Sequence, residues 1–150
     1  MSFDGFFVRK MVRELEESIV NGRINKVNNL STDEFIFSVR KGKNLKLFVS
    51  ANPSSSRIQL TNNSYENPST PSNFCSVLRK YLTGGIILEI NHLNNDRIIN
   101  FKIKNFDDLG YEKYYYLITE LMGKHSNIIL TNEENIILES LKNSYSLEYK

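Results

Sequence analysis

The sequence is poor in residues that build covalent or metal-centred sites. It holds one cysteine and two histidines in 150 residues. A single thiol, Cys75, excludes an internal disulfide and any site with several thiolate ligands, and it is typical of a protein kept in a reducing compartment. His92 and His125 belong to no HxxxH or HxxE pattern of the kind that holds zinc. We therefore expect no metal and no cofactor, and the predicted location is cytoplasmic.

Glycine and proline are also scarce, and long apolar runs are absent. Seven glycines and three prolines argue against a disordered chain, and no run of about 18 apolar residues predicts a membrane span. Asp4 and Arg9 interrupt the apolar stretch that a signal peptide needs. A chain of 150 residues is long enough to bury its own core. We expect one globular domain with no membrane partner.

Motifs for phosphate cradles and catalysis are missing too. Neither GxGxxG nor GxxxxGK[ST] occurs. Ser126 directly follows His125, but neighbours along a strand point to opposite faces, which separates a nucleophile from its base. Cys75 lies at the edge of an apolar helical stripe and is interpreted as a small buried hydrophobe. We expect the chain not to be an enzyme.

The net charge of +2 hides an uneven distribution. Residues 1–60 carry ten Lys/Arg and six Asp/Glu, whereas residues 61–150 carry nine and eleven. The N-terminal part is therefore basic and the remainder slightly acidic. This excess permits nucleic-acid binding but is too small to establish it.

Two segments show helical periodicity. The first begins after a candidate N-cap at Ser2 or Asp4 and ends at Asn21-Gly22; its apolar stripe consists of Val8, Met11, Val12, Leu15 and Ile19. The second begins at Thr70-Pro71, interpreted as an N-cap followed by proline at the first helical position, and ends before Gly84-Gly85; its stripe consists of Phe74, Val77, Leu78, Tyr81 and Leu82. Arg79 and Lys80 fall outside the centre of that stripe, so we expect the second helix to offer cations to a partner.

Nine further segments are predicted to be strands, because they alternate with a two-residue period or are rich in β-branched and aromatic residues. They are GRINKVNNL, EFIFSVRK, NLKLFVSA, SRIQLT, IILEINHL, DRIINFKIKN, EKYYYLITEL, SNIILT and NIILESL. The connections between them are too short for helical crossovers. The predicted fold class is α+β, an antiparallel β-sandwich of about eight to nine strands with two flanking helices.

One polar pair stands at the start of a predicted strand. Arg97 offers a planar fork of donors that suits a phosphate or a base edge, and Asp96 would orient that fork. A structural role explains the same pair, since Asp accepts N–H bonds in turns and Arg is an ordinary strand-end charge. Composition alone favours the structural role.

A second polar cluster, ELMGKHS, occupies 120–126 between two apolar strands. Gly123 permits close approach of the backbone, and Lys124 and His125 supply a cation and a ring. An ordinary strand-end turn explains Gly123 but leaves Glu120 without a reason. We therefore interpret this cluster as a strand-end surface, brought beside Asp96-Arg97 by strand pairing.

Six segments together resemble the N-terminal NFACT domain. They are MSFDG, NGRINKV (21–27), SANPSSSRIQLT (50–61), NPSTPSNFCSVLRKYL (67–82), DRIINF (96–101) and ELMGKHSNIIL (120–130). This domain heads the bacterial FbpA-like, or RqcH-like, "fibronectin-binding" proteins, whose eukaryotic relatives include nuclear export mediator factor and Caliban. The resemblance runs in order from Met1 to Leu141.

The resemblance implies a role in ribosome-associated quality control. Members of the family bind the large ribosomal subunit obstructed by peptidyl-tRNA, recruit tRNA and, in bacteria, promote addition of alanine to the stalled chain. By match to the family's motifs, the expected tRNA-binding residues are Asp96, Arg97, Glu120, Leu121 and Met122. Further candidates for contacts with the RNA backbone are Lys124, His125, Arg79 and Lys80.

The resemblance also implies a fold similar to the N-terminal domain of formamidopyrimidine-type DNA glycosylases. Their reaction does not follow, because they use an N-terminal proline amine followed by a glutamate, whereas this chain opens Met1-Ser2-Phe3-Asp4. The alternative function is a fibronectin-binding, adhesin-like module with fibronectin as the partner. We interpret residues 1–150 as an NFACT N-terminal domain, slightly truncated from a longer multidomain protein.

Overall fold

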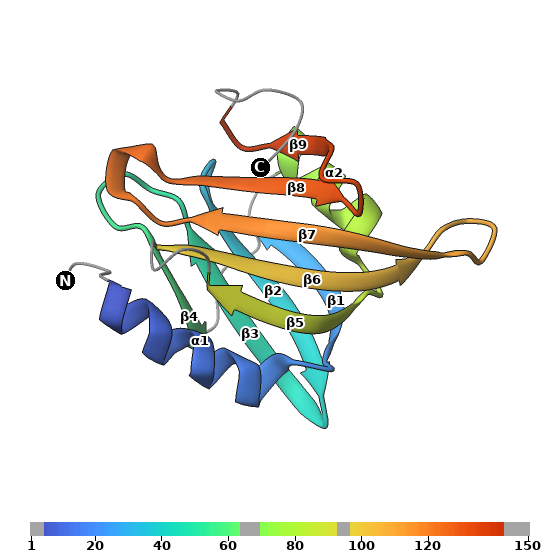
Figure 1. Ribbon diagram of the computed structural model, residues 1–150. Coiled ribbons are helices and arrows are strands. Elements are labelled where there is room, and N and C mark those ends of the chain that lie inside the picture. The colour runs from blue at the N-terminus through green and yellow to red at the C-terminus, as the bar shows by residue number, and fades with distance from the viewer. Residues whose placement is uncertain (1–4, 64–69, 93–96, 143–150) are drawn as a thin grey trace.

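A computed structural model describes residues 5–63, 70–92 and 97–142 (Figure 1). The helices are α1 (Gly5–Ile19) and α2 (Asn73–Leu82), with a single 3₁₀ turn η1 (Gly123–His125). The strands are β1 (Arg23–Asn29), β2 (Glu34–Lys41), β3 (Lys43–Ser50), β4 (Arg57–Thr61), β5 (Ile86–His92), β6 (Ile98–Phe106), β7 (Glu112–Glu120), β8 (Asn127–Asn132) and β9 (Ile137–Ser140). Each predicted strand segment overlaps one of these strands, so the α+β prediction is confirmed.

The nine strands form one antiparallel sheet in the order β4-β3-β2-β1-β5-β6-β7-β8-β9. Its two halves, β1 to β4 and β5 to β9, cross each other and give the molecule two layers (Figure 1). Buried apolar side chains from both halves and both helices belong to a single core cluster. The predicted sandwich is therefore one continuous sheet whose halves face each other. The likeness to glycosylase domains stays a prediction.

The helices pack on different strands and lie far apart from each other (Figure 1). α1 contacts β2, β4 and β5, whereas α2 contacts β1, β6 and β9. α1 ends at Ile19 and is followed by Asn21 with φ 72°; α2 ends at Leu82 and is followed by Gly84 with φ 86°. Both stops predicted from the sequence are confirmed, since asparagine and glycine tolerate this left-handed conformation best.

The predicted start of the second helix is wrong by two residues. Ser72, not Thr70, is the N-cap, and its Oγ accepts a hydrogen bond of 3.1 Å from the backbone N of Cys75. The backbone N of Ser72 donates in turn to Oδ1 of Asn29 on β1 at 3.3 Å. Pro71 therefore precedes the helix, because the side chain that satisfies the first free N–H groups lies one residue later. The candidate N-caps of the first helix, Ser2 and Asp4, lie outside the described residues.

The two halves of the sheet meet at a short seam between β1 and β5. Four backbone hydrogen bonds hold it: Asn21 N to Ile87 O (2.7 Å), Ile87 N to Gly22 O (3.0 Å), Ile24 N to Gly85 O (2.8 Å) and Gly84 N to Ile24 O (2.7 Å). The same bonds recur when the halves are exchanged, with Gly22 corresponding to Gly85 and Ile24 to Ile87. Each half thus consists of a helix followed by an antiparallel meander, and an approximate twofold relates them.

Gly22 and Gly85 fill equivalent tight positions at this seam. A Cβ on Gly22 would lie 2.6 Å from Cγ1 of Val39, and a Cβ on Gly85 would lie 2.7 Å from Cγ2 of Ile103. Real Cβ atoms essentially never come so close to a neighbour. The glycines that end the helices in the sequence therefore also permit the close packing that joins the halves.

No helix within the described ranges is long and apolar enough to cross a membrane.

Candidate nucleic-acid interface

The two predicted clusters lie side by side, because β6 pairs with β7. Ile98 is opposite Glu120 in the ladder, and the backbone N of Leu121 donates to the carbonyl oxygen of Arg97 at 2.8 Å. Arg97 is half-buried. The predicted convergence of the two segments is therefore confirmed for Arg97, whereas Asp96 lies outside the described residues.

The surface expected along 120–126 is smaller than predicted. Glu120 is 4% exposed, and Leu121 and Ser126 are completely buried. Ser126 is polar for a structural reason, since its Oγ accepts a hydrogen bond of 2.9 Å from the backbone N of Met122 and so closes the turn. The prediction that the whole cluster forms a surface is wrong, because three of its seven residues face the interior.

The exposed part of the cluster is the η1 turn. The backbone N of His125 donates to the Met122 carbonyl and that of Ser126 to the Gly123 carbonyl, each at 3.0 Å. Gly123 has φ 58°, which favours glycine. Lys124 and His125 are exposed. The turn therefore presents a cation and a ring next to the Arg97 strand end.

Asn127 fixes the strand that leaves the turn. Its Oδ1 accepts from the backbone N of Lys142 at 2.9 Å, and its Nδ2 donates to the carbonyl of the same residue at 3.1 Å. This side chain is 1% exposed. Its pair of hydrogen bonds to the backbone of Lys142 resembles the pairing between two strands and holds the chain that follows β9. Much of the polarity around 120–127 thus satisfies backbone groups, as buried segments require.

A loop that the sequence did not assign to the site also reaches the turn. The backbone N of Gly123 donates to Oγ of Ser56, in the β3–β4 connection, at 3.3 Å. The next residue, Arg57, stacks its guanidinium 4.9 Å from the centre of the Phe48 ring. The run of three serines after Pro53 was the available signal, but nothing local connects it with residues 67 positions further on.

The other predicted cations, Arg79 and Lys80, lie on α2, which contacts β1, β6 and β9. Arg79 Nε donates to the Val27 carbonyl at 2.7 Å, and one of its terminal nitrogens donates to Oδ1 of Asn28 at 2.8 Å. Arg79 therefore ties α2 to β1. Lys80 is exposed, with its ammonium 5.2 Å from the centre of the Tyr81 ring.

Cys75 lies beside this contact and is fully buried, as predicted. Its Sγ is 3.7 Å from the Val27 carbonyl. Burial raises the pKa of the Cys75 thiol, while the charge of Arg79 opposes the rise. The thiol is therefore held in its protonated form. Within the described residues no group of three or more His, Cys, Asp or Glu side chains is arranged to hold a metal ion.

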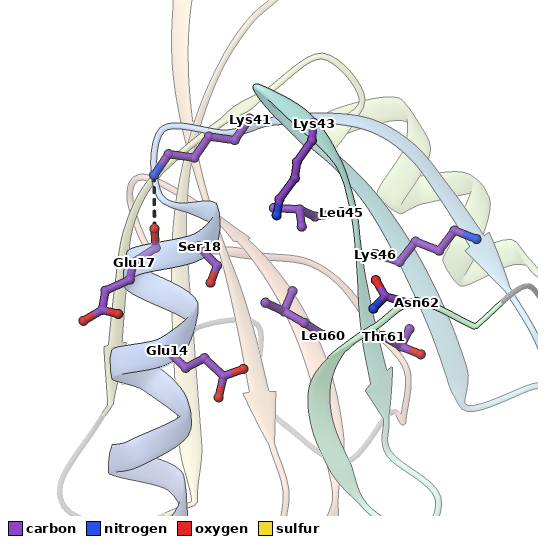
Figure 2. A pocket seen from close by; sticks show the side chains of 10 residues that line it. All are labelled: Glu14, Glu17, Ser18, Lys41, Lys43, Leu45, Lys46, Leu60, Thr61 and Asn62. Atoms are coloured by element: carbon purple, nitrogen blue, oxygen red, sulfur yellow. Dashed lines mark hydrogen bonds between the residues drawn. The ribbon is translucent and has the colours of Figure 1, made fainter.

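A groove of about 620 Å³ lies elsewhere, between the C-terminal half of α1 and the β2–β3 hairpin (Figure 2). Lys43 extends over Leu45 into this groove, Glu14 points toward it from α1, and Glu17 points away. Lys41 Nζ bridges the rim to the main-chain oxygen of Glu17 at 3.4 Å. The groove is mixed in charge and was not predicted from the sequence.

Comparison with known proteins places these features in a family. The family described as "NFACT N-terminal and middle domains" matches residues 4–147. The chain is 49% identical over 144 residues to the Rqc2 homolog RqcH of Bacillus subtilis, covering 95% of this chain and 25% of the relative. It is 25% identical over 140 residues to a Drosophila melanogaster ribosome quality control complex subunit, the NEMF homolog, covering 93% and 13%. The chain therefore spans about a quarter or less of the length of these relatives.

Solved structures agree with the sequence match. The N-terminal domain of the fibronectin-binding protein PavA from Streptococcus pneumoniae superimposes with a TM-score of 0.92 at 43% identity, covering 98% of this chain and 59% of that one. A fibrinogen-binding protein from Staphylococcus aureus superimposes with a TM-score of 0.90 at 38% identity, covering 100% and 56%. With its sequence and its fold both matched over nearly the whole length, the chain belongs to the family of NFACT N-terminal and middle domains.

Proposed function

We propose that the chain is the tRNA-binding module of a ribosome quality control factor. The observation that carries the proposal is the pairing of β6 with β7, which sets Arg97 beside the exposed η1 turn. The relatives named Rqc2 homolog and ribosome quality control complex subunit support the biological setting. The chain acts by binding, and no reaction step is assigned to any of its residues.

The chemistry of this surface suits a folded RNA. Arg97 supplies a planar donor that bonds phosphate or a base edge, and Lys124 supplies attraction to the backbone. His125 offers a ring on which an unpaired base can stack. Recognition of this kind depends on the shape and unpaired positions of the RNA.

The buried members of the predicted site act by positioning. Leu121 is completely buried, and its backbone holds the Arg97 main chain. Glu120 is nearly buried and Met122 half-buried, one on β7 and the other directly before the turn. These three residues fix where the turn stands relative to Arg97.

The test is binding of tRNA to the chain by fluorescence anisotropy. Arg97→Ala is expected to weaken binding about 10- to 100-fold, because a hydrogen bond to a charged group contributes about 1.5–3 kcal/mol. The matched control is Arg13→Ala, which removes an exposed arginine from α1 and leaves the affinity within about twofold. Unchanged affinity of a folded Arg97→Ala protein would remove this residue from the site.

The wider activity follows from the same proposal. Together with the remainder of a full-length relative, the chain would engage the large ribosomal subunit that carries peptidyl-tRNA and deliver tRNA for alanine addition to the stalled chain. That work is cytoplasmic. The reducing compartment indicated by the single cysteine, Cys75, supports this location.

A second candidate function is binding to fibronectin, which the name of the superimposable PavA domain favours. Salt separates the two candidates. Affinity for RNA falls steeply between about 50 and 200 mM salt, because bound phosphates release counterions. The second function would be favoured if the chain bound fibronectin tightly, with an affinity nearly independent of salt, and did not bind tRNA.

A further inference from the structure

A concentration of positive charge lies on β1, β2 and β3, away from the η1 turn. We call it the basic hairpin surface, and it consists of Arg23, Lys26, Arg40 and Lys46, which share one face of these three adjacent strands. The first three are exposed and Lys46 is half-buried, whereas Lys41 and Lys43 belong to the other face and line the groove beside α1. The ion pair found in the described part of the chain joins Lys104 to Glu112 at 3.5 Å, and so involves none of the four.

Strand pairing places two of these cations directly against each other. Arg23 is opposite Arg40 in the β1–β2 ladder. Like charges in directly opposed positions destabilise a sheet. The fold therefore tolerates an unfavourable pair within this surface.

The twofold-related half shows that the architecture does not require this charge. The position equivalent to Arg23 is Ile86, which is opposite Lys104. That lysine is neutralised by Glu112. The two halves share one architecture, but only the first half has a pair of like charges at this position. The repulsion in the first half is therefore not needed for folding and indicates another role.

Neutral oxygens are the partners that the structure gives to these cations. Arg23 donates to the Gly84 carbonyl at 3.1 Å, and Arg40 donates to Oδ1 of Asn44 at 3.2 Å. Lys46 donates to the Asn63 carbonyl at 3.3 Å. Such contacts hold the side chains without cancelling their charge. The side chains remain able to bind an anion.

Geometry also says which part of an RNA this surface would meet. Successive side chains of a strand point to opposite faces of the sheet. Val39 is buried, so Arg40 beside it points to the outer face. The strand pairing puts Arg23, Lys26 and Lys46 on the same outer face. The large exposed aromatic residues within the described ranges, Phe106 and Tyr111, belong to the β6–β7 hairpin instead. Cations without rings contact phosphates and do not stack on bases.

We propose that the basic hairpin surface is a second RNA contact, which binds the phosphate backbone of a double-stranded segment. The partner class rests on the proposed function. Within β3, the chain runs from Lys46 in this surface to Ser50, next to the loop that touches Gly123. Five residues of strand span about 16 Å, so one folded RNA reaches both contacts, with unpaired positions at the η1 turn and a helical segment at the hairpin.

The experiment measures binding of a blunt-ended RNA duplex to the chain by anisotropy across a salt series. A triple variant, Arg40→Gln with Lys26→Gln and Lys46→Gln, is expected to bind at least tenfold more weakly at low salt. Its slope of log K against log salt is expected to flatten by about two to three, since each lost phosphate contact contributes about 0.9. The matched control removes three cations elsewhere, at Lys10, Lys102 and Lys113, and is expected to keep the slope of the unmodified chain.

A second variant separates a binding defect from a folding defect. Arg40→Glu places opposite charges in the Arg23 pair, so its thermal denaturation midpoint is expected to rise while duplex affinity falls. Equal losses in the triple variant and its control would overturn the proposal, as would failure of the unmodified chain to bind duplex. Arg97→Ala distinguishes the two surfaces: if it leaves tRNA binding intact while the triple variant still loses duplex binding, the η1 site fails and the hairpin contact stands.

Discussion

Nε of Arg79 on α2 donates a hydrogen bond of 2.7 Å to the carbonyl oxygen of Val27 on β1. Together with its bond to Asn28, this contact fastens the second helix to β1, an inner strand of the sheet. Arg79→Leu keeps the bulk of the side chain but leaves the Val27 carbonyl without its charged donor. We expect the free energy of unfolding to fall by about 2 kcal/mol in urea denaturation.

The neighbouring lysine is the natural control for Arg79. Lys80→Leu alters an exposed position and is expected to change stability by no more than about 0.5 kcal/mol. RNA affinity of the folded Arg79→Leu protein should remain close to normal, because its donors already have partners. A large loss of tRNA binding without a loss of stability would show instead that Arg79 contacts RNA.

Asn127 is expected to matter for stability through its two bonds to the backbone of Lys142. Asn127→Ala removes both, and we expect a loss of about 2 kcal/mol, roughly 1 kcal/mol for each bond. Asn127→Asp keeps the acceptor but sets a buried carboxylate against the Lys142 carbonyl, so its loss should be at least as large. Urea denaturation measures both. If neither substitution altered the midpoint, Asn127 would not be holding the chain after β9.

Because Gly22 and Gly85 fill equivalent positions at the seam, we expect substitution of either by alanine to lower the stability by a similar amount. Gly22→Ala and Gly85→Ala each drive a methyl group against a branched side chain and a nearby carbonyl. We expect each to lower the free energy of unfolding by about 1–3 kcal/mol. Ser76→Ala, on the exposed face of α2, serves as the control within about 0.5 kcal/mol. Alanine tolerated at both seam positions would mean that the halves are not closely packed there.

Cys75 predicts a dependence of stability on alkaline pH. Burial raises the pKa of its thiol above the ordinary value of 9.0, so folding favours the protonated form. The stabilisation is complete below pH 9.0 and is lost as the pH rises through the higher value of the folded protein. Urea denaturation at several pH values should show stability falling less steeply above pH 9.0 in Cys75→Ala than in the unmodified chain. Comparing slopes removes the constant effect of the lost sulfur, and equal slopes would contradict the prediction.

The sequence predicted most of the secondary structure, because the periods of strands and helices are local. It also predicted the adjacency of Arg97 and the 120–126 segment, since both flank strands that follow one another in an antiparallel meander. It did not predict the burial of Glu120, which depends on packing that no local pattern records. The contact of Ser56 with Gly123 was missed for a similar reason, because it joins loops far apart in the chain.

The approximate twofold was equally hidden. Asn21-Gly22 and Gly84-Gly85 were recognised as helix stops, yet their common role at the seam required knowing that β1 and β5 are neighbours. The basic hairpin surface illustrates the same limit. The excess charge of residues 1–60 was visible in the sequence, but the opposition of Arg23 to Arg40 emerges only from strand register.

The seam also determines how the molecule can come apart. β1 and β5 are each an inner strand only because the other is present, and each would otherwise offer an open edge that invites pairing with another chain. The four bonds between them tie Ile24 and Ile87 to backbone on the far side of the boundary, and the core is shared across it. Neither meander is therefore a self-sufficient folding unit, and loss of one exposes the interior of the other, so the halves melt together.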